Sequence, residues 1–181
     1  MNFEAVFRLL IEQFQKYEIP FALIGGFALH AAGHSRATQD IDCLIAQKDE
    51  ETVKTILSSL GYEILHESKD VLNFGGRLKE LGHIDFLLAH RQYAKAMLER
   101  AEEIDVLNNT FKIKIVRPED IIGLKIQSSS NDASRYHQDM ADIEAVMRLK
   151  KNLDLELIRG YFKLFDREQE LDQILERIHH V

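Results

Sequence analysis

Three aspartates are the side chains with the clearest chemical potential in this sequence. Asp40 and Asp42 lie two residues apart in the alternating segment 39–46, and Asp85 lies in a second alternating segment, 83–88. Alternation predicts strands, on which residues i and i+2 point to the same face. Close carboxylates repel one another unless a cation lies between them. Because Mg²⁺ prefers oxygen ligands and keeps sites for water and phosphate, the aspartates are candidate metal ligands.

A glycine pair precedes the first two carboxylates. Gly25 and Gly26 follow the apolar segment 20–24, which predicts a strand, and precede 27–32, which predicts a short helix. Glycine N–H groups can approach a phosphate closely, and a helix N-terminus favours an anion. The pair therefore predicts a phosphate cradle, and a tight strand-to-helix turn is the alternative.

Each carboxylate also has a structural interpretation. Asp40 would then cap a loop, Asp42 would face solvent, and Asp85 would make a salt bridge. Short motifs carry a high risk of such false positives. The combination of a glycine turn with two aspartates on the next strand favours the chemical interpretation.

The elements that must position these residues predict an α+β fold, a mixed sheet flanked by helices. Apolar spacing predicts helices at 2–17, 49–60 and 92–102, and strands at 62–66 and 71–74 with Gly75-Gly76 as a turn. Strands 104–107 and 110–116 flank a hairpin turn at Asn108-Asn109. From Pro118 the pattern is helical, with a polar break at 128–132, a helix at 133–149 and two more at about 154–164 and 167–178. We therefore expect a core of 1–116 and a helical C-terminal part, 117–181, packed on it.

Composition narrows the functional classes. The net charge of −7 disfavours a nucleic-acid coat, although Lys112, Lys114 and Arg117 form a short basic strip. The single cysteine, Cys43, excludes an internal disulfide and a cysteine zinc cluster, which fits a reducing compartment. No apolar segment approaches the roughly 20 residues of a membrane span, so we expect a cytoplasmic protein without a membrane partner.

Taken together, these residues resemble the nucleotidyltransferase superfamily related to DNA polymerase β. The residues that carry the resemblance are Gly25, Gly26, Arg36, Thr38, Asp40, Asp42 and Asp85. The segments RATQDID (36–42) and RPEDIIGLK (117–125) are most similar to AbiEii-type toxins and related uncharacterised bacterial nucleotidyltransferases. Small aminoglycoside and lincosamide nucleotidyltransferases share the first half of the pattern.

The resemblance implies transfer of a nucleoside monophosphate from an NTP such as ATP to a hydroxyl acceptor, with two Mg²⁺ ions. Asp40 and Asp42 would hold the metals, and Asp85 would complete one metal site and orient or deprotonate the acceptor hydroxyl. The implied nucleotide-binding residues are Gly25, Gly26, Arg36, Thr38, Lys125 and Asp139. Arg36 has an alternative as a structural partner of Asp40 or another acid.

Lys125 and Asp139 lie in the helical part. Lys125, on an otherwise apolar helix, would reach the β- and γ-phosphates and stabilise the leaving pyrophosphate. Its alternative is a lysine that snorkels with its stem on the edge of the core. Asp139 would position Lys125 or Arg135, and its alternative is a surface i, i+4 pair with Arg135.

Two positions depart from the pattern of the resembling families. Phe27 follows the glycine pair where a small polar residue is usual, and Gln138 stands where lysine is usual. The resemblance implies an RNA acceptor, such as a tRNA end, and an antitoxin protein as partner. A small-molecule (antibiotic) acceptor is the alternative within the enzyme class. Phe27 and Gln138 support a third candidate, a non-catalytic module that binds a nucleotide or a partner.

Overall fold

The computed structural model describes residues 1–106 and 111–179. It divides into two compact units: unit 1 comprises Met1–Phe27 and Ala37–Val116, and unit 2 comprises Ala28–Arg36 and Arg117–Val181. Segment 28–36 thus belongs with the C-terminal helices. The domains 1–116 and 117–181 stay a prediction.

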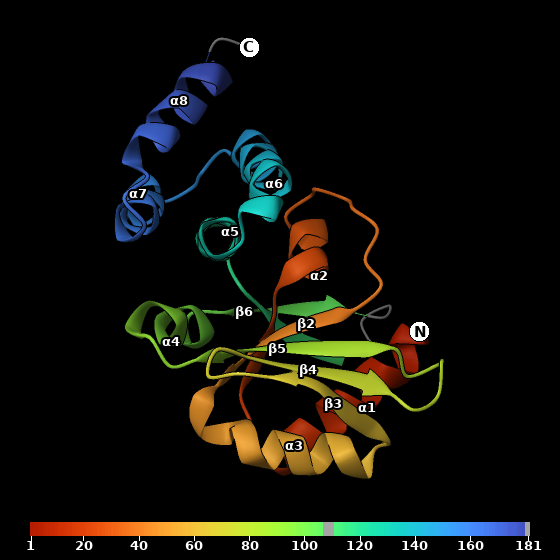
Figure 1. Ribbon diagram of the computed structural model, residues 1–181. Helices are drawn as coiled ribbons and strands as arrows, with labels where there is room; N and C mark the ends of the chain where they lie inside the picture. Colours follow the sequence, from red (N-terminus) through yellow and green to blue (C-terminus); the bar gives the residue numbers. More distant parts are fainter. Residues whose placement is uncertain (107–110, 180–181) are drawn as a thin grey trace. The chain divides into compact units, whose positions relative to one another are not determined.

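Unit 1 is built on a mixed sheet that has seven strands among the described residues, in the order β3-β4-β5-β2-β1-β7-β6 (Figure 1). The β2–β5 and β1–β7 pairs are parallel, and the other pairs are antiparallel. The strands are β1 (Phe21–Leu23), β2 (Ile41–Ala46), β3 (Tyr62–Glu67), β4 (Val71–Gly76), β5 (His83–Ala89), β6 (Glu102–Val106) and β7 (Phe111–Ile115). The predicted α+β class is confirmed. The predicted turn at Asn108-Asn109 lies outside the described residues.

Helices α1 (Phe3–Lys16) and α3 (Glu50–Ser59) lie on one face of this sheet (Figure 1). The apolar stripe of α1 is buried, and its Phe14 ring packs on Phe21 and Phe86 at centroid distances of 5.0 and 6.0 Å. Burial of each such large side chain stabilises the fold by about 1.5–3 kcal/mol. The 3₁₀ turn η1 (Gln47–Asp49) and helix α4 (Gln92–Glu99) complete the helical elements that lie wholly in unit 1.

Unit 2 is helical. Its elements are α5 (Pro118–Asn131), the 3₁₀ turn η2 (Ala133–Arg135), α6 (Tyr136–Leu149), α7 (Leu155–Leu164) and α8 (Glu168–His179). Pro118 occupies the first turn of α5, where its missing N–H costs nothing. Tyr161 of α7 donates a 2.6 Å hydrogen bond to buried Asp120 of α5. Charged residues near the start of α5 are therefore part of its packing.

Two local predictions are wrong. The polar segment 128–131 continues α5, because Ser129 Oγ donates to the helix carbonyl of Lys125 at 2.9 Å and also accepts a bond from Arg167. Gly75-Gly76 belongs to β4, where the Leu65 side chain of β3 fills the space above Gly75. In both cases contacts with other parts of the unit outweigh local turn preference.

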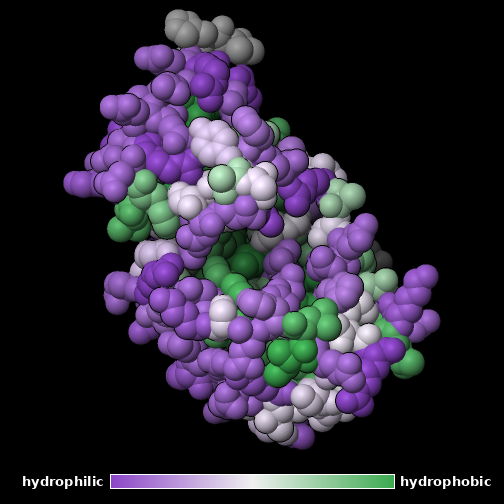
Figure 2. Space-filling view, in the orientation of Figure 1, coloured by the Kyte–Doolittle hydropathy of each residue, from purple (hydrophilic) through white to green (hydrophobic). Residues whose placement is uncertain are grey.

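Hydrophilic residues cover most of the face in Figure 2, in keeping with a charged content of 29%. Within the described ranges, every helix is too short or too polar to traverse a lipid bilayer.

Candidate active site

The carboxylates predicted in unit 1 lie on neighbouring strands. In the parallel β2–β5 register, Asp42 is the direct partner of Asp85. Asp40 comes one residue before β2, and its Oδ1 lies 3.3 Å from Nδ1 of His83 at the start of β5. Register partners on adjacent strands point to the same face of a sheet, so Asp42 and Asp85 are side by side.

Asp85 lies in an environment that opposes its negative charge. Burial raises its pKa; the 2.6 Å hydrogen bond from Asn73 Nδ2 lowers it, and the charge of Asp40 raises it again. The net pKa is above the ordinary value. Cys43, between these positions on β2, is fully buried. Its pKa lies well above the ordinary value, mainly because of burial and also because of the negative charges of Asp42 and Asp85. A cation near these carboxylates would relieve this repulsion.

The glycine pair forms the first turn of helix α2 (Gly25–Ala31), two residues earlier than predicted. Gly25 has φ +59°, and a Cβ there would overlap the Asp42 carboxylate. A Cβ on Gly26 would lie 2.6 Å from Cβ of Thr38, whose hydroxyl donates to the Asp40 carbonyl at 3.1 Å. The pair therefore lets the segment that carries the aspartates lie against α2. Sequence reasoning missed this role, because the motif does not reveal what approaches it.

Phe27, the departure after the glycine pair, is a packing residue. Its ring meets Phe3 and Phe7 of α1 edge to face, at centroid distances of 5.3 and 5.0 Å. Such pairs add about 0.5–1.5 kcal/mol beyond the area they bury. An aromatic residue at this position thus has a structural reason.

Phe27→Ser is expected to lower the free energy of unfolding by about 2–3 kcal/mol, because the half-buried ring loses both aromatic partners. Urea denaturation measures this loss. A double-mutant cycle with Phe7→Leu should give a coupling of about 0.5–1.5 kcal/mol. Additive single losses would contradict the packing role.

Lys125 and Asp139 belong to a buried charge cluster in unit 2. Lys125 Nζ lies 2.8 Å from Asp139 Oδ1 and 2.7 Å from Asp142 Oδ2. Lys125 is only 7% exposed, so the snorkelling alternative is wrong. Asp139 is 0% exposed and its Oδ2 also lies 3.3 Å from Arg135 Nε, so it is not a surface pair.

Asp142 is the centre of the same cluster. Arg36 Nη1 lies 3.1 Å from its Oδ2, and His34 Nε2 lies 3.3 Å from its Oδ1. Gln138, the second departure from the family pattern, donates to Oδ1 at 3.0 Å. The alternative for Arg36 as partner of an acid is therefore observed. Asp142 was absent from the predicted site, although its i, i+3 spacing from Asp139 places both on one helix face.

The cluster stabilises the ionised form of Asp139. Burial opposes ionisation, but hydrogen bonds from Lys125 and Ser128 and the charge of Lys125 outweigh it, so the pKa of Asp139 lies below its ordinary value. The structure thus brings together two sets of predicted residues. Unit 1 contains Gly25, Gly26, Thr38, Asp40, Asp42 and Asp85, and unit 2 contains Arg36, Lys125 and Asp139.

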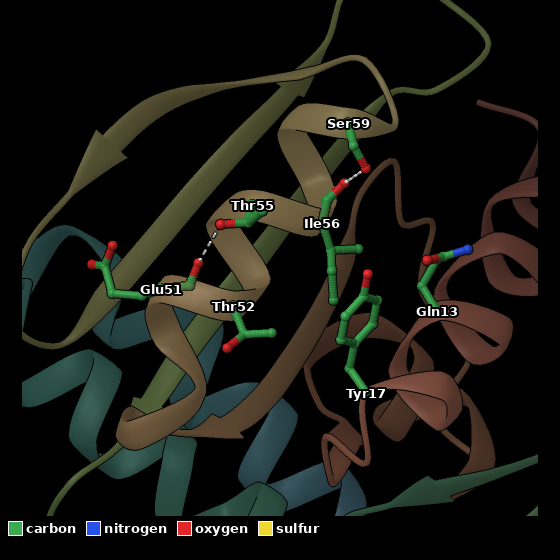
Figure 3. Close-up of a pocket in the computed structure, with 7 residues that line it drawn as sticks. All are labelled: Gln13, Tyr17, Glu51, Thr52, Thr55, Ile56 and Ser59. Atoms are coloured by element: carbon green, nitrogen blue, oxygen red, sulfur yellow. Dashed lines mark hydrogen bonds between the residues drawn. The ribbon is translucent and has the colours of Figure 1, made fainter.

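A hollow of about 340 Å³ between α1 and α3 is separate from both sets (Figure 3). Thr55 and Ser59 line it, but their hydroxyls donate to carbonyls of their own helix at 3.0 and 2.7 Å. None of the predicted site residues lines this hollow. The protons of these two hydroxyls are therefore already engaged within α3.

Fold and comparisons together define the class of protein: the chain is a nucleotidyltransferase. Within that class it belongs to the family described as "Nucleotidyl transferase of unknown function (DUF2204)", whose model matches residues 2–180. The predicted superfamily and enzyme class are thereby confirmed. The finer similarity to AbiEii-type toxins stays a prediction.

Solved structures share the fold. The solution structure of the antibiotic-resistance factor ANT(2'')-Ia has a TM-score of 0.64 at 16% identity, with 99% of each chain covered. A nucleotidyltransferase-like protein from Paracoccidioides brasiliensis gives 0.59 at 20% identity, over 97% of this chain and 92% of that one. The lincosamide adenylyltransferase LnuA with lincomycin gives 0.55 at 17%, over 81% and 98%. The search of curated proteins gave no match.

Proposed function

We propose that this nucleotidyltransferase moves a nucleoside monophosphate from an NTP to a hydroxyl acceptor, with Mg²⁺ bound by Asp40, Asp42 and Asp85. The main support is the parallel β2–β5 register, in which Asp42 is the partner of Asp85 and Asp40 lies at the same end of the strands. Gly25 leaves the space that the Asp42 carboxylate occupies.

The chemistry of the donor set fits Mg²⁺, because all three side chains offer carboxylate oxygens. A bound cation would also relieve the repulsion that raises the pKa of Asp85. Among the described residues, no three acidic, histidine or cysteine side chains are already gathered into a metal-binding group. The proposal therefore includes rotation of these side chains on metal binding. When bound, Mg²⁺ supplies charge neutralisation at the phosphates.

The protein's own groups have separate roles in this proposal. Asp85 orients the acceptor hydroxyl or accepts its proton, and the N–H groups of Gly25 and Gly26 contact phosphate oxygens. Thr38, which packs on Gly26, holds the aspartate segment in place through the Asp40 carbonyl.

The buried cluster of unit 2 suits the anionic triphosphate. Lys125, Arg36 and Arg135 contact Asp139 and Asp142, so three cationic groups face two buried carboxylates in this cluster. Two of the three ammonium donors of Lys125 are directed to Asp139 and Asp142, which leaves one for the β- or γ-phosphate. The side chains of Arg36 and Arg135, 39% and 51% exposed, are open to the nucleotide.

The acceptor has two candidates. A small molecule is favoured by the net charge of −7 and by the fold shared with ANT(2'')-Ia, seen in complex with adenylyl-2''-tobramycin, and with lincomycin-bound LnuA. RNA, such as a tRNA end, with an antitoxin partner, is favoured by the segment 36–42 and the basic strip at 112–117. We also propose a cytoplasmic location, which the single cysteine, Cys43, fits and which suits either acceptor.

Metal-linked nucleotide binding tests the proposal. Each of the four NTPs is added with Mg²⁺ or with EDTA, and unfolding is followed by heat and by urea. A nucleotide at 100 times its Kd should stabilise the parent by about 2.7 kcal/mol with Mg²⁺. Asp42→Ala should abolish the effect, whereas Asp105→Ala on the exposed β6 edge should retain it. A parent chain with no metal-linked effect from any NTP would be a non-catalytic relative or a binder of another ligand.

A further inference from the structure

A second, larger cavity of about 710 Å³ opens in unit 1. Ala46 and Ala89, partners at the ends of β2 and β5, line it. They are four residues beyond Asp42 and Asp85 on the same strands, and even spacing places them on the same face of the sheet. At about 3.3 Å per residue the cavity lies about 13 Å from the carboxylates along the strands. It is therefore a separate place on the same face.

Three lysines from different elements line this cavity: Lys48 after β2, Lys95 of α4 and Lys114 of β7. We name it the lysine cavity. Within residues 1–106 and 111–179, none of the three makes an ion pair. By contrast, Lys54 lies within 3 Å of three glutamate side chains. Glu99 is the single carboxylate in the lining, so the cavity carries a net charge of about +2 in an acidic chain.

The remaining walls are apolar. Pro20 and Leu98 contribute with the two alanines, and the lysine stems add methylene groups. Ligand sites of about 300–1,000 Å³ commonly combine such walls with a few charged groups. Lysine ammonium groups act as point charges for phosphate oxygens. The combination suits an organic body that carries phosphate and would repel a polycation.

We propose that the lysine cavity binds a phosphorylated small molecule of nucleotide size at a second site, separate from the carboxylates of the transfer reaction. The ammonium groups of Lys48, Lys95 and Lys114 pair with the phosphate, and the apolar walls contact the organic body. Because Asp40, Asp42 and Asp85 take no part, this binding requires no divalent metal. It goes beyond the proposed function and does not depend on it.

The test uses the full chain labelled with ¹⁵N, in EDTA and at low salt, titrated with AMP. We expect saturable amide shifts at Ala46, Lys48, Ala89 and Lys95. Lys114→Gln should weaken AMP binding about tenfold, the effect of one lost charge-assisted contact. Lys79→Gln, in the exposed turn between β4 and β5 and outside the lining, makes the same charge change and should leave the Kd unaltered.

Further measurements distinguish this site from the carboxylate site and from an RNA contact. Asp42→Asn should bind AMP in EDTA as the parent does, even if the nucleotidyl transfer proposed above proves wrong. Adenosine should bind at least tenfold more weakly than AMP, and inorganic phosphate should compete with AMP. The proposal is overturned if AMP gives no saturable shifts, if Lys79→Gln weakens binding as much as Lys114→Gln, or if adenosine binds as tightly as AMP. Saturable binding of a short single-stranded RNA but not of AMP would also overturn it, since the surface would then be an RNA contact.

Discussion

Lys125→Met is expected to lower the free energy of unfolding by about 3–5 kcal/mol at pH 7, the usual cost of removing one partner from a buried ion pair. The substitution leaves Asp139 and Asp142, both 0% exposed, without the ammonium group that contacts them at 2.8 and 2.7 Å. Urea denaturation measures the loss. Lys163→Met, on the exposed side of α7, removes the same charge and should change stability by less than about 0.5 kcal/mol.

The pH dependence distinguishes a charge effect from a packing effect. In the parent, the lowered pKa of Asp139 contributes stability that is present above the unfolded value of about 4 and is lost as the pH falls through the folded pKa. In Lys125→Met, burial without the ammonium raises that pKa, so stability is lost as the pH rises. The difference between parent and variant should therefore shrink from pH 7 to pH 4. A difference that is constant with pH would contradict the role of the cluster.

Gly25→Ala is expected to reduce nucleotidyl transfer by about 10²-fold or more. The new Cβ would overlap the Asp42 carboxylate, which must then move, and displacement of a reacting group by about 1 Å can cost this much. The φ of +59° adds about 1–2 kcal/mol of strain for a residue other than glycine. Initial rates and urea denaturation separate the two effects.

Gly61→Ala provides the matched control for backbone strain. Gly61 also has positive φ, +90°, but a Cβ there meets only Leu81 Cδ1 at an ordinary 3.6 Å. We expect similar destabilisation with a transfer rate close to that of the parent. Equal loss of activity in both variants would show that strain, and not the approach of Asp42, explains the effect.

Much of the candidate site in unit 1 could be predicted from local patterns in the sequence. Alternation predicted the strands at Asp42 and Asp85, and the glycine pair predicted the start of a helix near them. The sequence alone could not establish that Asp42 and Asp85 are register partners, because strand order is a property of the whole sheet. The sequence alone also could not reveal that Phe27 contacts Phe3 and Phe7, because these contacts depend on how α1 packs in the folded unit.

The cluster in unit 2 was less predictable. Arg36 and Asp142 are 106 residues apart in the chain, and no periodicity links them. Helical spacing related Asp139 to Asp142, but the burial that makes both carboxylates depend on Lys125 comes from packing of α5 against α6. The serines at 128–130 look like a polar break in the sequence, because the sequence does not show that Ser129 and Ser130 accept hydrogen bonds from the distant Arg167.

Transfer of label from an NTP tests the central claim most directly. The chain is incubated with each α-³²P-labelled NTP, Mg²⁺ and, in separate reactions, total RNA or a panel of hydroxyl-bearing small molecules including antibiotics. We predict that label appears on one acceptor class with release of pyrophosphate, that EDTA abolishes it, and that Asp42→Asn reduces it by at least about 10³-fold while the fold is retained. Label transfer that continues undiminished in EDTA or in Asp42→Asn would contradict a metal reaction at Asp40, Asp42 and Asp85.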